Sequence, residues 1–286
     1  VRKRIYYNSW TNGKTVTTLL WHGNFDNRAC FWKRTQAIAL LRSCIDPRAV
    51  HHGGQRVLVT HLQTSLQKQY DLAIPYQVQQ FVSHDALLAR ELAATAGQRN
   101  QGESSDDASA IEETVFICQS GDTLEFTVYL DHDVLDIASE NTRTDRHGRL
   151  HTYEQHTIDS LCTIVEGVSH AVCLLWHAHH DRQLRAVDLE LQAEVDKYML
   201  LMACNPDDDS RGRLRRQLFD NARFTAPADT ALHQRYKVAS EGAASYCEWL
   251  SQAFPGPADQ TGLSQELARF YRLSGAAKFE HIRRLH

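Results

Sequence analysis

The sequence lacks the cysteine pairs and long apolar runs that would place it in several familiar classes of protein. Its seven cysteines are scattered and form no C-x-x-C pair, which argues against a secreted disulfide framework and a zinc ribbon. No apolar run approaches the roughly 20 residues of a membrane-spanning helix. Ordinary hydrophobic and charged contents of 42% and 23% exclude wholesale disorder. We therefore expect a cytoplasmic globular protein that does not span a membrane.

The common catalytic signatures are missing as well. The chain contains no G-x-x-x-x-G-K-[ST], G-x-G-x-x-G, G-x-S-x-G or H-E-x-x-H sequence. These patterns mark phosphate-binding loops, dinucleotide sites, serine hydrolases and zinc proteases, so none of those classes is indicated. Whether the protein catalyses any reaction is left open by the sequence.

Glutamate is absent from residues 1–56. That segment holds ten Lys or Arg and two Asp, so it carries a charge of +8, whereas residues 57–286 carry −12. It also contains Trp10, Trp21 and Trp32 and shows no sustained hydrophobic period. We predict a basic extension that is poorly structured or not part of the native fold. The weaker alternative is nucleic-acid binding through this basic, aromatic segment, although the acidic remainder of the chain does not favour nucleic acid as a partner.

From residue 57 onward the pattern predicts an α+β fold, predominantly α, with one β-hairpin packed on a C-terminal helical bundle. Residues 57–95 form a short helical segment, in which Pro75 suits the first turn of a second helix. Residues 96–110 are rich in Gly, Gln, Ser and Asp and predict a disordered linker. Residues 111–286 hold the hairpin and the bundle, and we expect them to form a single domain with residues 57–95.

The hairpin is the clearest β signal. Leu124, Phe126, Val128 and Leu130 alternate with polar or aromatic residues, as in a half-buried strand. Gly121 supplies a turn residue between this strand and the preceding run of β-formers. After the hairpin, Asp131 is expected to cap a short helix. Further helices are predicted over residues 153–180, after residue 181, over 214–224 and over 229–254, with a last one bent at Gly275.

Half of the sixteen histidines lie between residues 132 and 180. On one helix over residues 153–181, the side chains of Glu166, His170, His177 and Asp181 fall within about 60° of one another. Histidine and carboxylate ligands on one helix face can hold a divalent metal that activates water or oxygen. These four residues are therefore the candidate metal ligands.

The same helix offers a second interpretation of this stripe. Its main apolar face centres about 160° away from Glu166 and His170, so the stripe has the position of an ordinary solvated face. The apolar face consists of Ile158, Leu161, Val165, Val168, Val172, Leu175 and Trp176. The sequence favours the solvated interpretation, and a second layer of helix covering the stripe would restore the metal site.

Residues 177–182 resemble the H-x-H-x-D-H metal-binding motif of the metallo-β-lactamase fold. His177, His179 and Asp181 match, but Arg182 stands where that motif has its last histidine. That motif follows a strand, whereas its surroundings here read as helix, so no function is transferred from the family.

Three further features concern single side chains. Cys162 or Cys173 beside a histidine leaves nucleophilic chemistry open, with inert packing as the alternative. Asp188 lies at the edge of an apolar helix face, so we expect it to pair with an arginine such as Arg185. Lys197 has the spacing of an ordinary surface ion pair with Glu194.

A long, acidic bundle without catalytic motifs favours a non-catalytic protein-interaction or regulatory module, with another protein as partner. The alternative is a metal-dependent enzyme, hydrolytic or oxidative, that uses the Glu166 and His170 stripe and a divalent metal. Under the first interpretation no cofactor is expected.

Overall fold

The computed structural model describes residues 53–90, 111–120, 123–144, 150–151, 154–180, 182–204, 208–222 and 228–286. The predictions for residues 1–52 and for the linker at residues 96–110 therefore lie outside the described residues. The helices are α1 (Gly53–Tyr70), α3 (His132–Asn141), α4 (Gln155–His179), α5 (Ala186–Cys204), α6 (Asp208–Arg215), α7 (Ala231–Ala253), α8 (Gln260–Arg272) and α9 (Ala276–Arg283). The strands are β1 (Val82–Ser83), β2 (Glu113–Ser120), β3 (Thr123–Leu130), β4 (Arg143–Thr144) and β5 (Leu150–His151).

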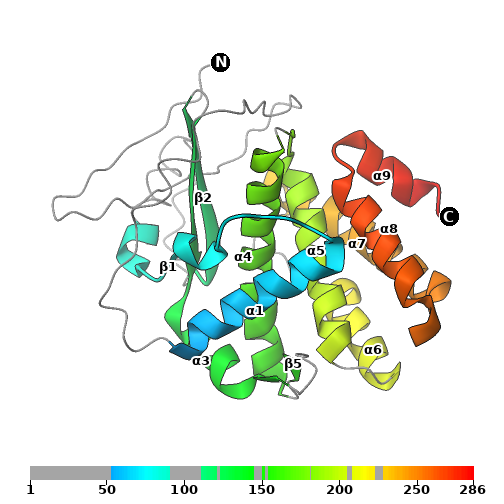
Figure 1. Cartoon of the computed structure of the whole chain (residues 1–286), viewed down its shortest axis with the longest axis horizontal. Helices are drawn as coiled ribbons and strands as arrows, with labels where there is room; N and C mark the ends of the chain where they lie inside the picture. The colour runs from blue at the N-terminus through cyan, green and yellow to red at the C-terminus, as the bar shows by residue number, and fades with distance from the viewer. Residues whose placement is uncertain are drawn as a thin grey trace.

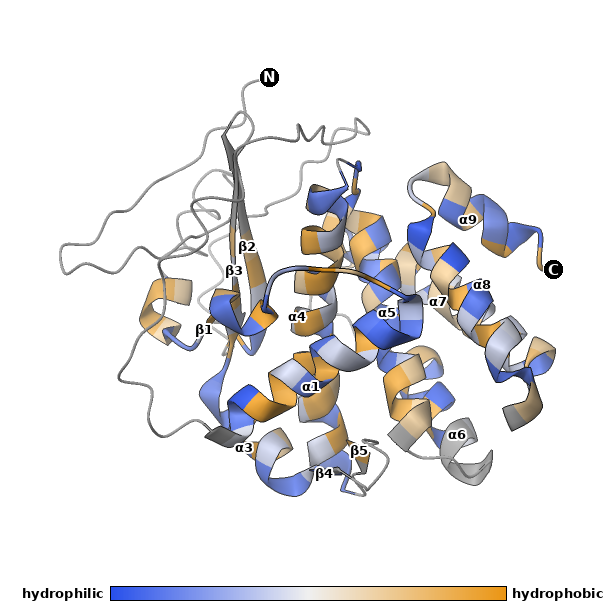
Figure 2. Cartoon of the chain, in the orientation of Figure 1, coloured by the Kyte–Doolittle hydropathy of each residue, from blue (hydrophilic) through white to orange (hydrophobic). Residues whose placement is uncertain are grey.

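The fold is α+β and predominantly α, as predicted. Helix α4 lies at the centre and packs against α1, α3, α5 and the strands β2 and β3. Helix α5 separates α4 from α7, and α8 packs on α1 (Figure 1). Apolar residues recur along α4 and the two long strands (Figure 2). The central position of α4 explains why it resembles a membrane-spanning helix in length and composition, since most of its apolar stretch is buried inside the protein.

The predicted hairpin is confirmed. Strands β2 and β3 are antiparallel, and Glu113 pairs with Leu130 at the open end. Strand β3 is not half-buried, however, because every residue from 126 to 130 is buried. It is the middle strand of a three-stranded sheet in the order β1-β3-β2, and Thr127 on its second face donates a hydrogen bond to the carbonyl of Phe81.

The prediction of a continuous helix after Pro75 is wrong. Residues Val78–Phe81 form a single 3-10 turn, and the chain then extends into β1, which pairs parallel with β3. The backbone groups of β1 form hydrogen bonds with β3, whereas in a helix they would form hydrogen bonds within the segment itself. Residues 57–95 are therefore not simply helical, as far as they are described.

The boundary at residue 56 also needs correction. Helix α1 begins at Gly53, so residues 53–56 belong to the fold and not to the extension. Gln55 is buried, and its amide donates a 2.7 Å hydrogen bond to Asp136 on α3. Other predicted features are confirmed, including the cap of α3 by Asp131 and the break between α8 and α9 at Gly275.

The sheet approaches α4 closely at Gly167. A Cβ atom added to Gly167 would lie 3.0 Å from side-chain carbons of Val128 and Leu130 and 3.2 Å from Cγ of Glu113. Contacts this short are rare for real Cβ atoms, so any larger residue would require these side chains to move by a few tenths of an ångström. The close approach brings the first residue of β2 beside the middle of α4.

Candidate metal centre

The stripe that carries Glu166 and His170 does not face solvent. Every residue of α4 from 167 to 177 is buried, including the polar side chains of His170 and His177. A helix in the middle of a protein is covered on all sides, by the sheet on one side and by α5 on another. The solvated interpretation is therefore wrong, and the stripe lies against a second layer of structure.

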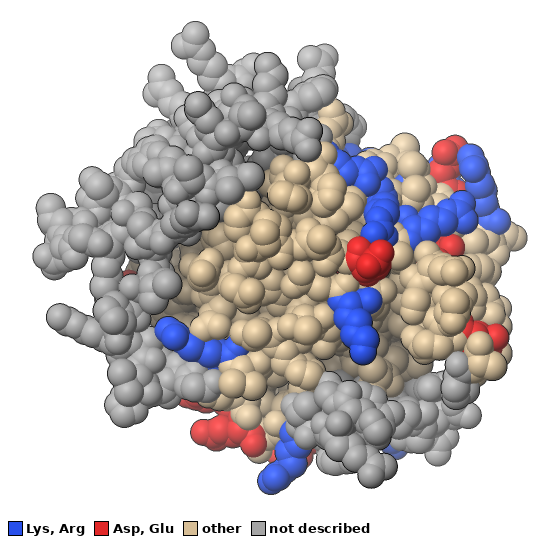
Figure 3. Space-filling view, in the orientation of Figure 1, with Lys and Arg blue, Asp and Glu red and all other residues tan. Residues whose placement is uncertain are grey.

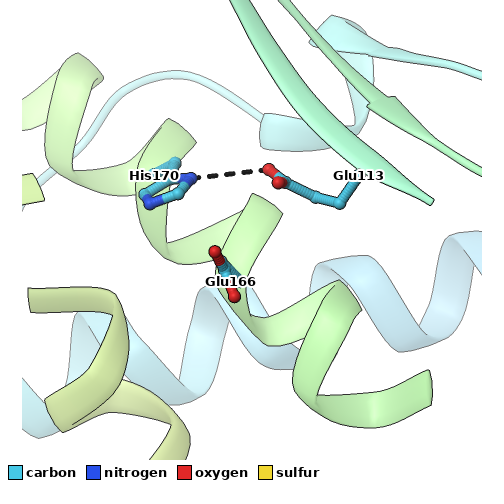
Figure 4. A group of neighbouring side chains, drawn as sticks. All are labelled: Glu113, Glu166 and His170. Carbon is cyan, nitrogen blue, oxygen red and sulfur yellow. Dashed lines mark hydrogen bonds and ion pairs between the residues drawn. The ribbon is translucent and has the colours of Figure 1, made fainter. Parts of the chain in front are cut away.

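Two residues of the predicted metal set meet a third ligand that the sequence did not indicate. Glu113, Glu166 and His170 each offer one ligand atom, and these atoms all lie within 4.8 Å of one another. Glu113 reaches from the start of β2 toward α4, and its Oε1 lies 3.4 Å from Nδ1 of His170 (Figure 4). Glu166 lies one turn before His170 on the same helix. The hairpin and the central helix together form this site.

A second carboxylate lies near the other imidazole nitrogen of His170. Oε2 of Glu190, on α5, is 3.5 Å from Nε2, at ion-pair distance although outside hydrogen-bond geometry. The other oxygen of Glu190 lies 3.7 Å from Nε of Arg235, on α7. His170 is thus placed between carboxylates from β2 and α5. Metal-binding histidines are commonly oriented in this way, by a carboxylate on the nitrogen that does not bind the ion.

Lys197 forms the third part of the cluster. Its Nζ donates to Oε2 of Glu166 at 2.9 Å and to Oε1 of Glu194 at 2.7 Å. The predicted pair with Glu194 therefore exists, but it is not a surface pair, because the side chain of Lys197 is only 10% exposed. The complete cluster contains four carboxylates, two cationic side chains and one imidazole from β2, α4, α5 and α7. Its members are Glu113, Glu166, His170, Glu190, Glu194, Lys197 and Arg235.

Burial and neighbouring charges shift the pKa values of the side chains in this cluster. Burial raises the pKa of Glu113 above the ordinary value, although His170 opposes this shift. Burial alone would lower the pKa of His170, but Glu113 and Glu190 outweigh it and raise that pKa well above 6.5. Burial would likewise raise the pKa of Glu166, but Lys197 and His170 hold it below the ordinary value. Neighbouring positive charge therefore favours the ionised form of Glu166, whereas burial favours the protonated form of Glu113.

The face drawn in Figure 3 shows no large acidic patch in its described part. In the part of that face which the structure describes, most of the surface is uncharged, and Lys and Arg gather toward α8 and α9 (Figure 3). The side chains of Glu113 and Glu190 are 13% and 12% exposed. Those of Glu166 and Glu194 are 28% and 19% exposed, so the four carboxylates are partly buried where the sheet, α4 and α5 meet.

Of the other two predicted ligands, His177 does not join the cluster. His177 lies two turns beyond His170, and its Nδ1 contacts the carbonyl oxygen of Cys173 at 2.9 Å. Burial lowers the pKa of His177 to about 4, so the ring is neutral at physiological pH and packs against Trp176 and Tyr271. Asp181 lies outside the described residues. The resemblance to the metallo-β-lactamase motif also fails, because His177 and His179 lie on α4 and not after a strand.

The described cysteines on α4 do not have the features of nucleophiles. Sγ of Cys173 lies 3.5 Å from Nδ1 of His177, but burial raises the pKa of that thiol to about 12. Burial raises the pKa of Cys162 to about 12 as well. A catalytic thiol needs its pKa lowered, so inert packing is the better interpretation of both residues.

A second buried polar group lies on the neighbouring face of α5. Asp196 accepts hydrogen bonds from the hydroxyls of Tyr70 and Ser169 and from the amide of Gln192, and burial raises its pKa to about 6. Gln192 in turn accepts a 2.7 Å hydrogen bond from Nζ of Lys278, on α9. These contacts connect α1, α4, α5 and α9, so the group holds the C-terminal helix to the core.

Comparison of the chain with protein-family models, with curated proteins and with solved structures found no match. Function is therefore inferred from the geometry of the cluster around His170.

Proposed function

We propose that the protein is a metal-dependent enzyme that binds one divalent transition-metal ion through Glu113, Glu166 and His170. The observation that carries the proposal is the convergence of three ligand atoms within 4.8 Å of one another, on two elements that the close contact at Gly167 holds together. The bound ion would activate a water molecule or dioxygen, which makes the reaction hydrolytic or oxidative.

The surroundings of the three ligands support this proposal. The cluster holds four carboxylates around the permanent cations Lys197 and Arg235 and around His170, and a divalent ion bound to His170 would replace the positive charge that the raised pKa of its ring favours. Glu190 is placed to accept from the imidazole nitrogen of His170 that faces away from Glu113, which would fix the ring for binding. Without such positive charge, partly buried carboxylates this close together would be costly.

The ligand types narrow the choice of ion. Two carboxylates and one imidazole form a mixed oxygen and nitrogen set, which suits Mn²⁺, Fe²⁺ or Zn²⁺ better than Ca²⁺ or Mg²⁺. Three protein ligands also leave coordination positions for water and substrate, as in catalytic rather than structural metal sites. A redox-active ion would favour the oxidative reaction, and Zn²⁺ would favour hydrolysis.

The test is elemental analysis of untagged protein, followed by calorimetric titration of the chelated protein with Mn²⁺, Fe²⁺ under argon and Zn²⁺. We expect about one ion per chain and a rise in melting temperature, since a ligand that binds the native state stabilises it. Glu113→Gln and His170→Ala should each weaken binding by roughly tenfold or more. No stoichiometric ion and no thermal stabilisation by any of the three would refute the proposal.

A matched control is available in the pair of Glu266 and His281. Their Oε1 and Nε2 atoms lie 2.6 Å apart, and both side chains are about as buried as His170 and Glu113. The substitution Glu266→Gln should reduce stability without changing metal affinity, because this pair lies apart from the cluster that contains His170.

Activity would then be sought with nitrophenyl esters and phosphates and by oxygen consumption. The protein-interaction role expected from the sequence stays a prediction.

A further inference from the structure

Lys197 is a buried cation that forms a hydrogen bond with Glu166, one of the proposed metal ligands. Its Nζ donates to one oxygen of Glu166 and to one oxygen of Glu194. The residue as a whole, backbone included, is 8% exposed. Lysine at such a position neutralises the carboxylates as a metal ion would, but from a fixed point on α5. We infer that Lys197 is a built-in competitor of the metal and sets the affinity of the site. This inference rests on the proposed function.

The competition follows from which atoms the two cations need. Lys197 holds Oε2 of Glu166, whereas the proposed ion requires an oxygen of the same carboxylate together with Glu113 and His170. A divalent ion bound there would lie close to the ammonium group, and two positive charges at short range inside a protein repel strongly. Binding must therefore overcome the repulsion or move Lys197 away from Glu166.

Glu194 gives Lys197 an alternative position. The ammonium group already donates to Oε1 of Glu194 at 2.7 Å, a shorter contact than the 2.9 Å contact to Glu166. Glu194 is three residues before Lys197 on the same helix, so the pair can persist when Glu166 turns toward an ion. The arrangement of two carboxylates around one lysine therefore allows Glu166 to be released without leaving Lys197 unpaired.

The experiment compares two substitutions that break the same ion-pair network. Lys197→Met removes the competing charge, so Mn²⁺ and Zn²⁺ should bind at least roughly tenfold more tightly than to the wild-type protein. Glu194→Gln removes the alternative partner, so Lys197 should remain on Glu166 and the same ions should bind several-fold more weakly. Both affinities are measured by calorimetry on the full chain, and Lys237→Met, which breaks the exposed contact to Glu241, is the control that should change neither.

Changes of opposite sign in metal affinity for the two variants distinguish this inference from a purely structural role of Lys197. If Lys197 only supported the fold, both substitutions would loosen the site and both would weaken metal binding. Equal or weaker binding by folded Lys197→Met, or unchanged binding by Glu194→Gln, would overturn the inference. Should Lys197→Met fail to fold, Lys197→Gln provides a second variant without the charge, and tighter binding by that variant is required alongside weaker binding by Glu194→Gln.

The outcome also distinguishes the inference from the proposed function. A wild-type protein that binds the ions, together with a Lys197→Met variant that binds no more tightly, would overturn only the inference. A wild-type protein that binds none, together with a variant that does, would support the inference and overturn the metal centre in the natural chain. If neither protein binds Mn²⁺, Fe²⁺ or Zn²⁺, both are wrong.

Discussion

The contact at Gly167 offers the sharpest single perturbation of the site, because it lies between the hairpin and α4 and touches neither proposed ligand on α4. In Gly167→Ala the new methyl carbon would lie 3.0 Å from carbons of Val128 and Leu130 and 3.2 Å from Cγ of Glu113. Something must move, and the hairpin is the part that can. We expect β2 to shift outward and to increase the 3.4 Å separation of Glu113 and His170.

The size of the effect follows from two opposing contributions. Alanine is favoured over glycine in a helix by about 1 kcal/mol. Inserting a methyl group into a packed interior costs about 1 to 3 kcal/mol. All three close contacts of Gly167 are shorter than 3.4 Å, so the upper half of that range applies, and we expect a net loss of about 1 to 2 kcal/mol. Urea unfolding of the metal-free protein measures it.

Gly242 on α7 provides the matched control. A Cβ atom there would meet Leu191 and Phe279 at 3.3 Å, which is a milder contact at a position away from the hairpin. Gly242→Ala should change stability little and leave Mn²⁺ affinity unchanged, whereas Gly167→Ala should weaken Mn²⁺ binding roughly tenfold. A Gly167→Ala protein that gains about 1 kcal/mol and binds Mn²⁺ normally would refute the view that close seating of the hairpin forms the site.

Three further predictions concern the rest of the core. Burial lowers the pKa of His177 from 6.5 to about 4, so between those values the unfolded chain binds a proton that the native protein does not, and stability should fall as pH decreases through that window. The free energies of unfolding of wild type and His177→Gln, measured by urea denaturation, should diverge by roughly 3 kcal/mol between pH 7 and pH 4. Parallel pH dependences of the two free energies would contradict this. Asp188 accepts two hydrogen bonds from Arg185 and one from the backbone N–H of Gly275, so Asp188→Ala should cost about 2 kcal/mol and more than Asp188→Asn, which retains an acceptor for Gly275. Because burial raises the pKa of Cys162 and Cys173 to about 12, iodoacetamide at pH 8 should label neither thiol until the protein is unfolded, and peptide mapping that finds either one labelled in native protein would contradict their inert packing.

Elements with a strong local pattern were predictable from the sequence. The alternation from Leu124 to Leu130 predicted β3, and spacings of three and four predicted α7 to within a few residues. Asp188 was expected to pair with an arginine, and Arg185 bonds it through two nitrogens. Each of these features depends on residues close together in the chain, where the geometry of a helix or strand decides which side chains meet.

Long-range pairing limited the prediction of the site. Glu113 and His170 are 57 residues apart in the chain, and the contact exists because β2 begins beside the middle of α4. No local pattern indicates that register, although the absence of a side chain at Gly167 is a weak sign of a close approach. His177 was selected by helical angle alone, and angle does not distinguish residues two turns apart that meet different neighbours.

The expectation that Glu166 and His170 lie on a solvated face of α4 was wrong for a general physical reason. Hydrophobic periodicity identifies the most apolar face of a helix, but it does not tell whether the opposite face meets solvent or another layer. Helix α4 is covered by the sheet and by α5, so Glu166 and His170 had to be accommodated inside the protein, where carboxylates need compensating charge. Lys197, Arg235 and His170, whose pKa its carboxylate neighbours raise, supply that charge. A core chosen for stability alone would place apolar side chains here, since replacing a buried ionic group with well-packed hydrophobic residues is often neutral or stabilising. The cluster around His170, which helical periodicity alone assigns to solvent, is thus the part of the core that apolar packing explains least.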